Sequence, residues 1–218
     1  YYSFKELEIT SLTIEEGVIE IKSCAFENCK QLKKVTLPST LKTIDESVFK
    51  GCELLEEINL PEGLESISVN AFTNTAIEKL VLPSTLVSFR TSSVGNYELI
   101  GDNDNYKEID GVIFSKDGKK LIAYPGGRDE DVYVIPEGVT TIGEEAFSHA
   151  KVKEIVMPST LKNILYGAFV YMPNLKKCVI PEGVEMLENY LFTFETSDFS
   201  SLALEELTLP STLKILKS

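Results

Sequence analysis

A motif of about 23 residues recurs along this chain, and it constrains the fold more than any other feature. Its skeleton is an apolar residue, two free positions, an apolar residue, one free position, an apolar residue, then proline and a turn that leads to Ala-Phe. The clearest copy runs from Leu54 to Phe72. A single copy cannot bury its apolar face, so successive copies must stack on one another. The period therefore predicts a solenoid in which each copy is one coil.

Aligning the copies on the residue that begins each turn shows how regular the repeat is. The turns begin at Glu15, Pro38, Pro61, Pro83, Pro136, Pro158, Pro181 and Pro210. The steps between them are 23, 23, 22, 53, 22, 23 and 29 residues. We therefore expect a right-handed solenoid of about eight coils, most of them 22–23 residues long.

An aromatic column follows each turn after eleven residues. Its members are Phe26, Phe49, Phe72, Val94, Phe147, Phe169 and Phe192, with valine as the exception. We expect these side chains to stack inside the solenoid as a spine. Phe4 stands at the equivalent position ahead of Glu15 and should begin that spine.

Each coil divides into short elements. The residues before the turn, such as Lys34–Leu37, alternate between inward and outward positions, which predicts a short strand of a parallel sheet on the concave face. Proline ends this strand because it cannot donate to the ladder. A second extended piece, such as Leu64–Ile67, is expected to form the opposite wall, followed by a single helical turn over Val69–Phe72.

The turns themselves follow a slower rhythm. Glu-Glu-Gly or Pro-Glu-Gly occurs at positions 15, 61, 136 and 181, and Pro-Ser-Thr occurs at 38, 83, 158 and 210. The two types alternate strictly, so the repeating unit is two coils. The alternation continues across the 53-residue step, which we therefore interpret as one coil that carries an insertion.

The insertion occupies residues 90–131. Its core, Gly111–Tyr124, has two apolar runs on either side of Asp117-Gly118, which predicts a β-hairpin. We expect the hairpin to project from the solenoid, where interaction residues tend to lie. We interpret residues 1–218 as a single solenoid domain. Because both ends fall inside coils without polar caps, we also expect either a longer protein or an end that packs on another subunit.

The composition argues against several functions. The net charge is −13, whereas nucleic-acid binding requires clustered Lys and Arg. The sequence contains no run of about 18 apolar residues, so we do not predict membrane insertion. The four cysteines are too scattered for a disulfide scaffold, and we interpret them as buried small side chains. No motif supplies a nucleophile for the single histidine, His149, so we predict neither a catalytic site nor a cofactor or metal.

One acidic segment has the residue types of a calcium site. Asp102, Asp104 and Asp110 lie close together in the sequence with two asparagines. Calcium prefers such oxygen ligands, but the spacing lacks the glycine and terminal glutamate of a calcium loop. A solvated loop is the preferred interpretation.

The outward positions of the predicted strands carry the candidate binding site. Four residues before the turns, Lys34, Glu57 and Lys79 should form a ladder of charges, as should Glu154, Lys177 and Glu206. Two residues before the turns, four successive valines should form an apolar stripe on the concave face. The residues we predict to contact a partner are Val81, Val134, Val156 and Val179, together with Val132, Phe114 and Tyr124.

These motifs resemble the BspA-like leucine-rich repeat family, whose coils read L-x-x-[IV]-x-[IL]-P-x-x-[LV]-x-x-I-x-x-x-A-F-x-x-C. Leu32–Cys52 and Leu55–Phe72 carry the resemblance, and Asp110–Gly118 is similar to an insertion that recurs in the family. The resemblance implies a leucine-rich repeat solenoid from a bacterial cell-surface or secreted protein, often an adhesin for host matrix proteins or other cells, with no catalytic site. The cysteine column departs from the pattern after Cys52, which favours packing over redox chemistry.

Two functional hypotheses follow. The first is an extracellular, adhesin-like domain that binds a protein partner through the concave face and the hairpin insertion. The second is a structural spacer with no ligand of its own. The sequence leaves the ligand, the anchor and the oligomeric state open.

Overall fold

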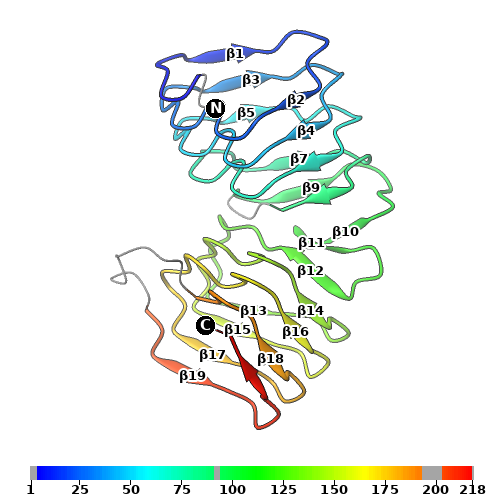
Figure 1. Ribbon diagram of the computed structural model, residues 1–218, viewed down its shortest axis with the longest axis vertical. Helices are drawn as coiled ribbons and strands as arrows, with labels where there is room; N and C mark the ends of the chain where they lie inside the picture. Colours follow the sequence, from blue (N-terminus) through cyan, green and yellow to red (C-terminus); the bar gives the residue numbers. More distant parts are fainter. Residues whose placement is uncertain (1–3, 91–93, 193–202, 218) are drawn as a thin grey trace.

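The computed structural model describes residues 4–90, 94–192 and 203–217, which wind into a parallel-strand solenoid of about eight turns (Figure 1). Each coil has two short strands on opposite walls and a run of turns on a third side. The first wall consists of β1 (Ser11–Thr13), β3 (Lys34–Thr36), β5 (Glu57–Ile58), β7 (Leu80–Leu82), β9 (Tyr97–Leu99), β13 (Val132–Val134), β15 (Glu154–Val156), β17 (Lys177–Val179) and β19 (Glu206–Thr208).

The second wall lies across the core from the first. It consists of β2 (Glu20–Ile21), β4 (Thr43–Ile44), β6 (Ser66–Ile67), β8 (Ser88–Phe89), β12 (Lys120–Ala123), β14 (Thr141–Ile142), β16 (Asn163–Ile164), β18 (Met186–Leu187) and β20 (Ile215–Leu216). The first wall is divided into the sheets β1-β3-β5, β7-β9 and β13-β15-β17-β19, and the second wall is interrupted between β8 and β12. Within each sheet, strands of successive coils pair in parallel with equivalent residues opposite one another, as in Ile44 with Ile67. The predicted repeat fold with parallel strands is confirmed.

The third side of the coil is built from turns and not from the helical turn that we predicted. Its backbone conformation alternates, and Asn70 and Asn74 adopt φ angles of 58° and 57°. This alternation points every second N–H group at the next coil. Phe26 N–H donates to the carbonyl of Val48 at 3.0 Å, and Phe49 N–H donates to that of Ala71 at 2.9 Å. A helix would direct these donors along its own axis, so the turns replace it because they extend the hydrogen bonding between coils. Within the described part of the chain, no helix could cross a membrane.

The predicted aromatic spine lies inside these turns. Phe4, Phe26, Phe49 and Phe72 stack with ring centroids 5.4, 5.7 and 5.8 Å apart. A second stack joins Phe147, Phe169 and Phe192, at 5.8 and 5.7 Å. This spacing exceeds the ~4.8 Å between paired strands because the rings are inclined and offset.

The alternation of turn sequences has a direct structural cause. Ser39 donates its N–H and its hydroxyl to the two carboxylate oxygens of Glu16, at 2.9 and 3.0 Å. The N–H of Gly17 donates to the hydroxyl of Thr40 at 2.9 Å. The same clamp joins Glu62 to Ser84, Glu137 to Ser159 and Glu182 to Ser211. Each Glu-Gly turn is therefore bonded to the Ser-Thr turn that follows it, which makes a pair of coils the repeating unit.

The insertion divides the solenoid into an N-terminal half (β1 to β8) and a C-terminal half (β13 to β20). β10 (Tyr106–Ile109), β11 (Val112–Ser115) and β12 form an antiparallel meander, which joins the second wall because β12 pairs in parallel with β14. At the other end of the insertion, β9 pairs with β7. The segment therefore forms an irregular coil of its own, visible as the green strands between the two halves in Figure 1.

The meander does not project from the surface, so our expectation of an overhanging hairpin is wrong. Ile113 and Ala123 pack into the hydrophobic core of the N-terminal half, whereas Val112, Phe114 and Leu121 pack into that of the C-terminal half. Both faces of β11 are apolar because both faces are buried, which is how a strand between two cores reads in sequence. The insertion fills the space between the two halves.

Replacing Phe147 by alanine tests the spine. Its ring is fully buried between Tyr124 and Phe169, at centroid distances of 5.1 and 5.8 Å. The cavity left behind should lower the free energy of unfolding by about 3–5 kcal/mol. Urea denaturation followed by circular dichroism measures this change. The exposed control Val134→Ala should cost less than about 0.5 kcal/mol, and equal losses in the two variants would contradict the spine.

Acidification tests the turn clamps. Hydrogen bonds from the backbone N–H and then the hydroxyl of the partner serine lower the pKa values of Glu16, Glu137 and Glu182 below their ordinary 4.5. The clamps therefore add stability that is complete above pH 4.5 and is lost as the pH falls through the lowered folded values. The urea midpoint of the triple variant E16Q/E137Q/E182Q should fall less between pH 5 and pH 3 than that of the wild type. Glu15→Gln is the control, and a wild-type slope in the triple variant would exclude the clamps.

Candidate partner-binding face and the junction cavity

The outward side of the first wall in the C-terminal half carries exposed valines. Val132, Val134, Val156 and Val179 have exposed fractions of 45%, 62%, 41% and 39%, and we call these four residues the valine face. Val134 lies directly opposite Val156 on the neighbouring strand. The alternate residues Ile155 and Cys178 point inward and are buried, so strand alternation places the valines outside.

Charged side chains border the valine face on the same strands. Glu154 lies opposite both Val132 and Lys177, and Lys177 lies opposite Glu206. The amino group of Lys177 is 3.9 Å from the carboxylate of Glu154. The arrangement is an apolar centre with a charged border, which is the usual composition of a protein-binding surface.

Three of the predicted contact residues lie elsewhere. Val81 is half-buried and pairs with Glu98 of β9, so it belongs to a separate sheet and does not continue the stripe. Phe114 and Tyr124 are 1% and 0% exposed. Both rings pack in the core of the C-terminal half and are unavailable to a partner, so their assignment to the binding surface is corrected.

The predicted charge ladder is present in part. Lys34 lies opposite Glu57, with the amino group 2.7 Å from the carboxylate. Lys79 does not reach Glu57 and pairs with Glu98 instead, because β7 bonds to β9 and not to β5. These are exposed pairs, each worth about 0–1 kcal/mol, so they help to fix the register more than they stabilise the fold.

Tyr124 occupies a position that the repeat alignment missed. Its N–H donates to the carbonyl of Ala146 at 2.8 Å and its ring stacks on Phe147, which makes it the spine residue of the insertion coil. Burial, and then the hydrogen bond to Glu130, raises the pKa of its hydroxyl. The guanidinium of Arg128 lies 5.7 Å from the ring centroid and 3.1 Å from Asp110. This network closes the insertion on the first-wall side. The pair Ala123-Tyr124, which stands in place of Ala-Phe, was the signal of the spine position in the sequence.

The cysteines are thiols within the packed coils. Cys52 Sγ donates to the carbonyl of Phe26 at 3.2 Å, and Cys29 Sγ donates to that of Phe4 at 3.2 Å. Burial raises the pKa of Cys52 to about 12. All four cysteines are free thiols; Cys29, Cys52 and Cys178 are buried, as the packing interpretation expected, whereas Cys24 is half-buried.

The acidic segment of the insertion has internal partners. Asp102 pairs with Lys116, and Asp110 with Arg128. The buried amide of Asn103 donates to the carbonyls of Ser84 and Leu86 at 2.9 and 3.0 Å and accepts from two N–H groups. Its role is therefore to fasten the loop to the last coil of the N-terminal half. Among the described residues, no group of three His, Cys, Asp or Glu side chains is arranged to hold a metal ion.

His149 lies on the third side, half-buried against the ring of Tyr171 at 4.8 Å. Its Nδ1 is 2.9 Å from the hydroxyl of Ser148, a neighbour that no sequence motif pairs with it. Ser148 is only 1% exposed, so a substrate could not reach that hydroxyl. The pair is a packing contact of the turn.

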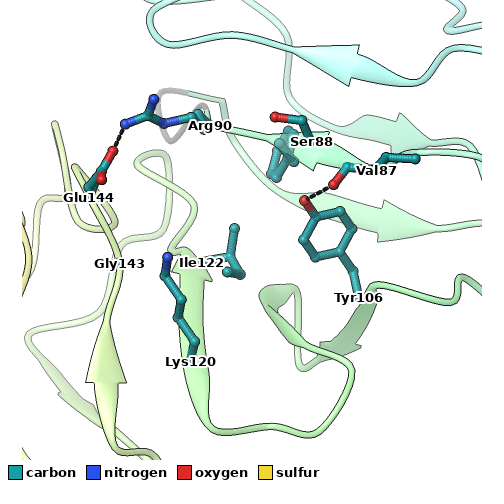
Figure 2. Close-up of a pocket in the computed structure, with 9 residues that line it drawn as sticks. Val87, Ser88, Arg90, Tyr106, Lys120, Ile122, Gly143 and Glu144 are labelled. Atoms are coloured by element: carbon teal, nitrogen blue, oxygen red, sulfur yellow. Dashed lines mark hydrogen bonds and ion pairs between the residues drawn. The ribbon is translucent and has the colours of Figure 1, made fainter. Parts of the chain in front are cut away.

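A polar cavity lies where the second wall is interrupted. The ladder ends at β8 and resumes at β12, and a space of about 280 Å³ remains between them (Figure 2). Arg90 crosses the gap to Glu144, and the hydroxyl of Tyr106 donates to the carbonyl of Val87 at 2.8 Å. Lys120 points into the same space from β12. The sequence offered no signal for this cavity.

Comparison with known proteins is consistent with this architecture. The sequence profile described as the BspA type leucine rich repeat region matches six copies, over residues 1–101 and 131–218. No curated protein sequence matches the chain.

Solved structures with the same fold come from bacteria. A leucine-rich repeat protein from Eubacterium ventriosum has a TM-score of 0.62 at 19% identity, over 94% of this chain and 74% of that one. A leucine rich cell surface protein from Faecalibacterium prausnitzii has a TM-score of 0.55 at 23% identity, over 96% and 79%. The pneumococcal vaccine antigen PcpA has a TM-score of 0.55 at 21% identity, over 96% and 74%. At these identities the likeness establishes the fold alone.

A titration of the single histidine tests the packing of the third side. Burial, and then the positive charge of Lys50, lowers the pKa of His149 from 6.5 to about 4. The folded protein therefore holds the ring neutral, and the stability that this burial contributes is complete above pH 6.5 and is lost as the pH falls toward 4. The imidazole proton resonances should titrate near pH 4 in the folded protein and near 6.5 in urea. A folded-state midpoint above 6 would contradict the burial.

Proposed function

The chain belongs to the BspA-type leucine-rich repeat family, and from that premise we propose that it is a protein-interaction domain of a bacterial surface or secreted protein, which binds a protein partner on the valine face. A repeat fold of this family suits an interaction or a structural role. The finer assignment rests on one observation, the exposed valines of the C-terminal half. Because those apolar side chains face water, they contribute no burial free energy to the stability of the fold.

The contrast between the two halves supports this choice of surface. In the N-terminal half, the positions two residues before the turns are the exposed polar residues Thr13, Thr36 and Asn59, and the valine there, Val81, is half-buried. Strand propensity alone would allow valine in either half, since threonine and valine both favour strands. Apolar side chains gathered on adjacent strands of one half therefore favour a docking surface over a simple preference for strand formers.

The backbone beneath the valine face suits a rigid binding surface. β13, β15, β17 and β19 form one continuous sheet, and their spacing is fixed by pairing between coils. A partner would meet side chains that are already positioned, so little conformational entropy would be lost on binding. The face does not include the hairpin, whose apolar residues belong to the core.

Charge should guide the encounter with the partner. The chain carries a net charge of −13, and Glu154 and Glu206 border the valines. A partner surface with an apolar centre and basic residues around it would complement this pattern. Association should therefore slow as salt is added, whereas the apolar contacts should persist.

A spacer without a ligand is the second candidate. Hydrogen bonds join successive coils on three sides, and the insertion packs into both halves. Such a stack would resist bending and could hold another domain away from a cell surface.

Substitutions on the valine face distinguish binding from spacing. Val134→Glu and Val156→Glu should each weaken capture of a specific partner from a panel of purified extracellular-matrix proteins by about tenfold or more, because each buries a charge at the centre of the contact. Surface plasmon resonance measures the affinity of each variant.

Matched controls lie in the same column of the N-terminal half. Thr13→Glu and Thr36→Glu add the same charge at exposed strand positions and should change the affinity by less than about twofold. Equal losses in both halves would contradict the valine face. Failure of the wild type to capture any matrix protein, together with a normal fold, would favour the spacer.

A further inference from the structure

The cavity at the junction of the two halves brings together groups from segments far apart in the sequence. Its roof is Val87–Arg90 in and around β8, its two sides are Tyr106 and the pair Gly143–Glu144, and its floor is Lys120 and Ile122 of β12 (Figure 2). It exists because β8 and β12 do not pair. Side chains, and not backbone hydrogen bonds, must therefore join the two parts of the second wall here.

Lys120 is the charged side chain of this cavity without an oppositely charged partner among the described residues. Its side chain is half-buried, and in the part of the chain that the structure describes it pairs with no carboxylate. Its stem packs over Gly143, where an added Cβ would lie 3.2 Å from Cε of the lysine. The stem is therefore packed against the backbone while the amino group is directed at the cavity (Figure 2).

The charge balance inside the cavity is positive. Arg90 and Lys120 supply two cations, and Glu144, which pairs with Arg90, supplies the one carboxylate. Burial, and then repulsion by Arg90, lowers the pKa of Lys120. A second anion would remove both penalties, because it would replace the lost hydration and separate the two cations.

Donors for such an anion are already in place. A lysine amino group has three N–H donors, and a guanidinium has five, of which Glu144 uses only a part. Ser88 adds a hydroxyl at the roof. This set matches the acceptor oxygens of a carboxylate or a phosphate group, and in a chain of net charge −13 a cavity with a positive balance is an exception.

We propose that this cavity binds a small oxyanion, a free phosphate or a small carboxylic acid, which Lys120 and Arg90 hold between β8 and β12. The volume of about 280 Å³ is below the ~300–1,000 Å³ of pockets for drug-sized ligands, which limits the ligand to a small one. The bound anion bridges two strands that share no backbone hydrogen bonds. Binding therefore stiffens the junction between the two halves.

Titration with inorganic phosphate and, separately, with acetate tests the proposal. Two-dimensional NMR at constant ionic strength should show saturable shifts at the amides of Ser88, Lys120 and Gly143. The probe that binds with the higher affinity, which we call the stronger probe, identifies the oxyanion. Absence of saturable shifts with both, or an equal response to chloride, would overturn the proposal.

Two variants and a control make the result specific. Lys120→Met should weaken binding of the stronger probe by about tenfold or more, since it removes a charged donor. Lys119→Met removes the same charge from the preceding exposed residue and should change the affinity by less than about twofold. Unaltered spectra away from the cavity show that the fold of each variant is intact, and equal affinities for the two methionine variants would overturn the site.

Glu144→Gln provides the opposite change. It removes the carboxylate that competes for Arg90, so binding of the same probe should tighten by about threefold or more. A loss of affinity in this variant would exclude Arg90 from the site. The valine face lies on the other wall, so binding to matrix proteins is measured independently.

Discussion

Hydrogen bonding between successive coils is the constraint on which this structure depends. A short strand of two or three residues is unstable by itself, and here each is held by pairing with an equivalent strand of a neighbouring coil, as β4 is held by β2 and β6. The third side obeys the same rule with turns in place of strands, since alternate N–H groups donate to the next coil. Every coil must therefore repeat the backbone path of its neighbour. Side chains at equivalent positions are stacked as a result, which creates the aromatic spine, the turn clamps and the valine face.

The same constraint explains why the junction differs from the rest. An insertion of this size cannot follow the path of the neighbouring coils, so the ladder of each wall is interrupted where it enters. The chain compensates with packing: β11 presents Ile113 to one core and Phe114 to the other. Compensation is incomplete at the second wall, where β8 and β12 are bridged by Arg90 and Glu144 around a cavity. Polar side chains gather there because backbone groups do not close the gap.

How much could be predicted follows from this distinction between repeated and unrepeated parts. Columns such as Phe26, Phe49 and Phe72 could be read from the sequence because each member repeats the environment of the last. The alternation of turns was visible too, although its cause, the bond from Ser39 to Glu16, required coordinates. The prediction for Val81 is wrong because the first wall is broken between β5 and β7, and the prediction for Phe114 is wrong because the apolar hairpin is buried between two cores. The cavity was missed because Arg90, Lys120 and Glu144 share no period.

The location of the candidate sites follows from the same argument. A regular coil satisfies its own backbone and core, so function on it must come from outward side chains, which adjacent coils can supply as a flat, rigid array. The valine face is a surface of this kind. An interrupted coil leaves polar groups without backbone partners, and these can enclose a small ligand. A repeat solenoid with one insertion thus offers a broad surface for a macromolecule on its regular wall and a confined polar site at its break. The surface requires regularity and the cavity requires its loss, so the two sites can change independently of one another.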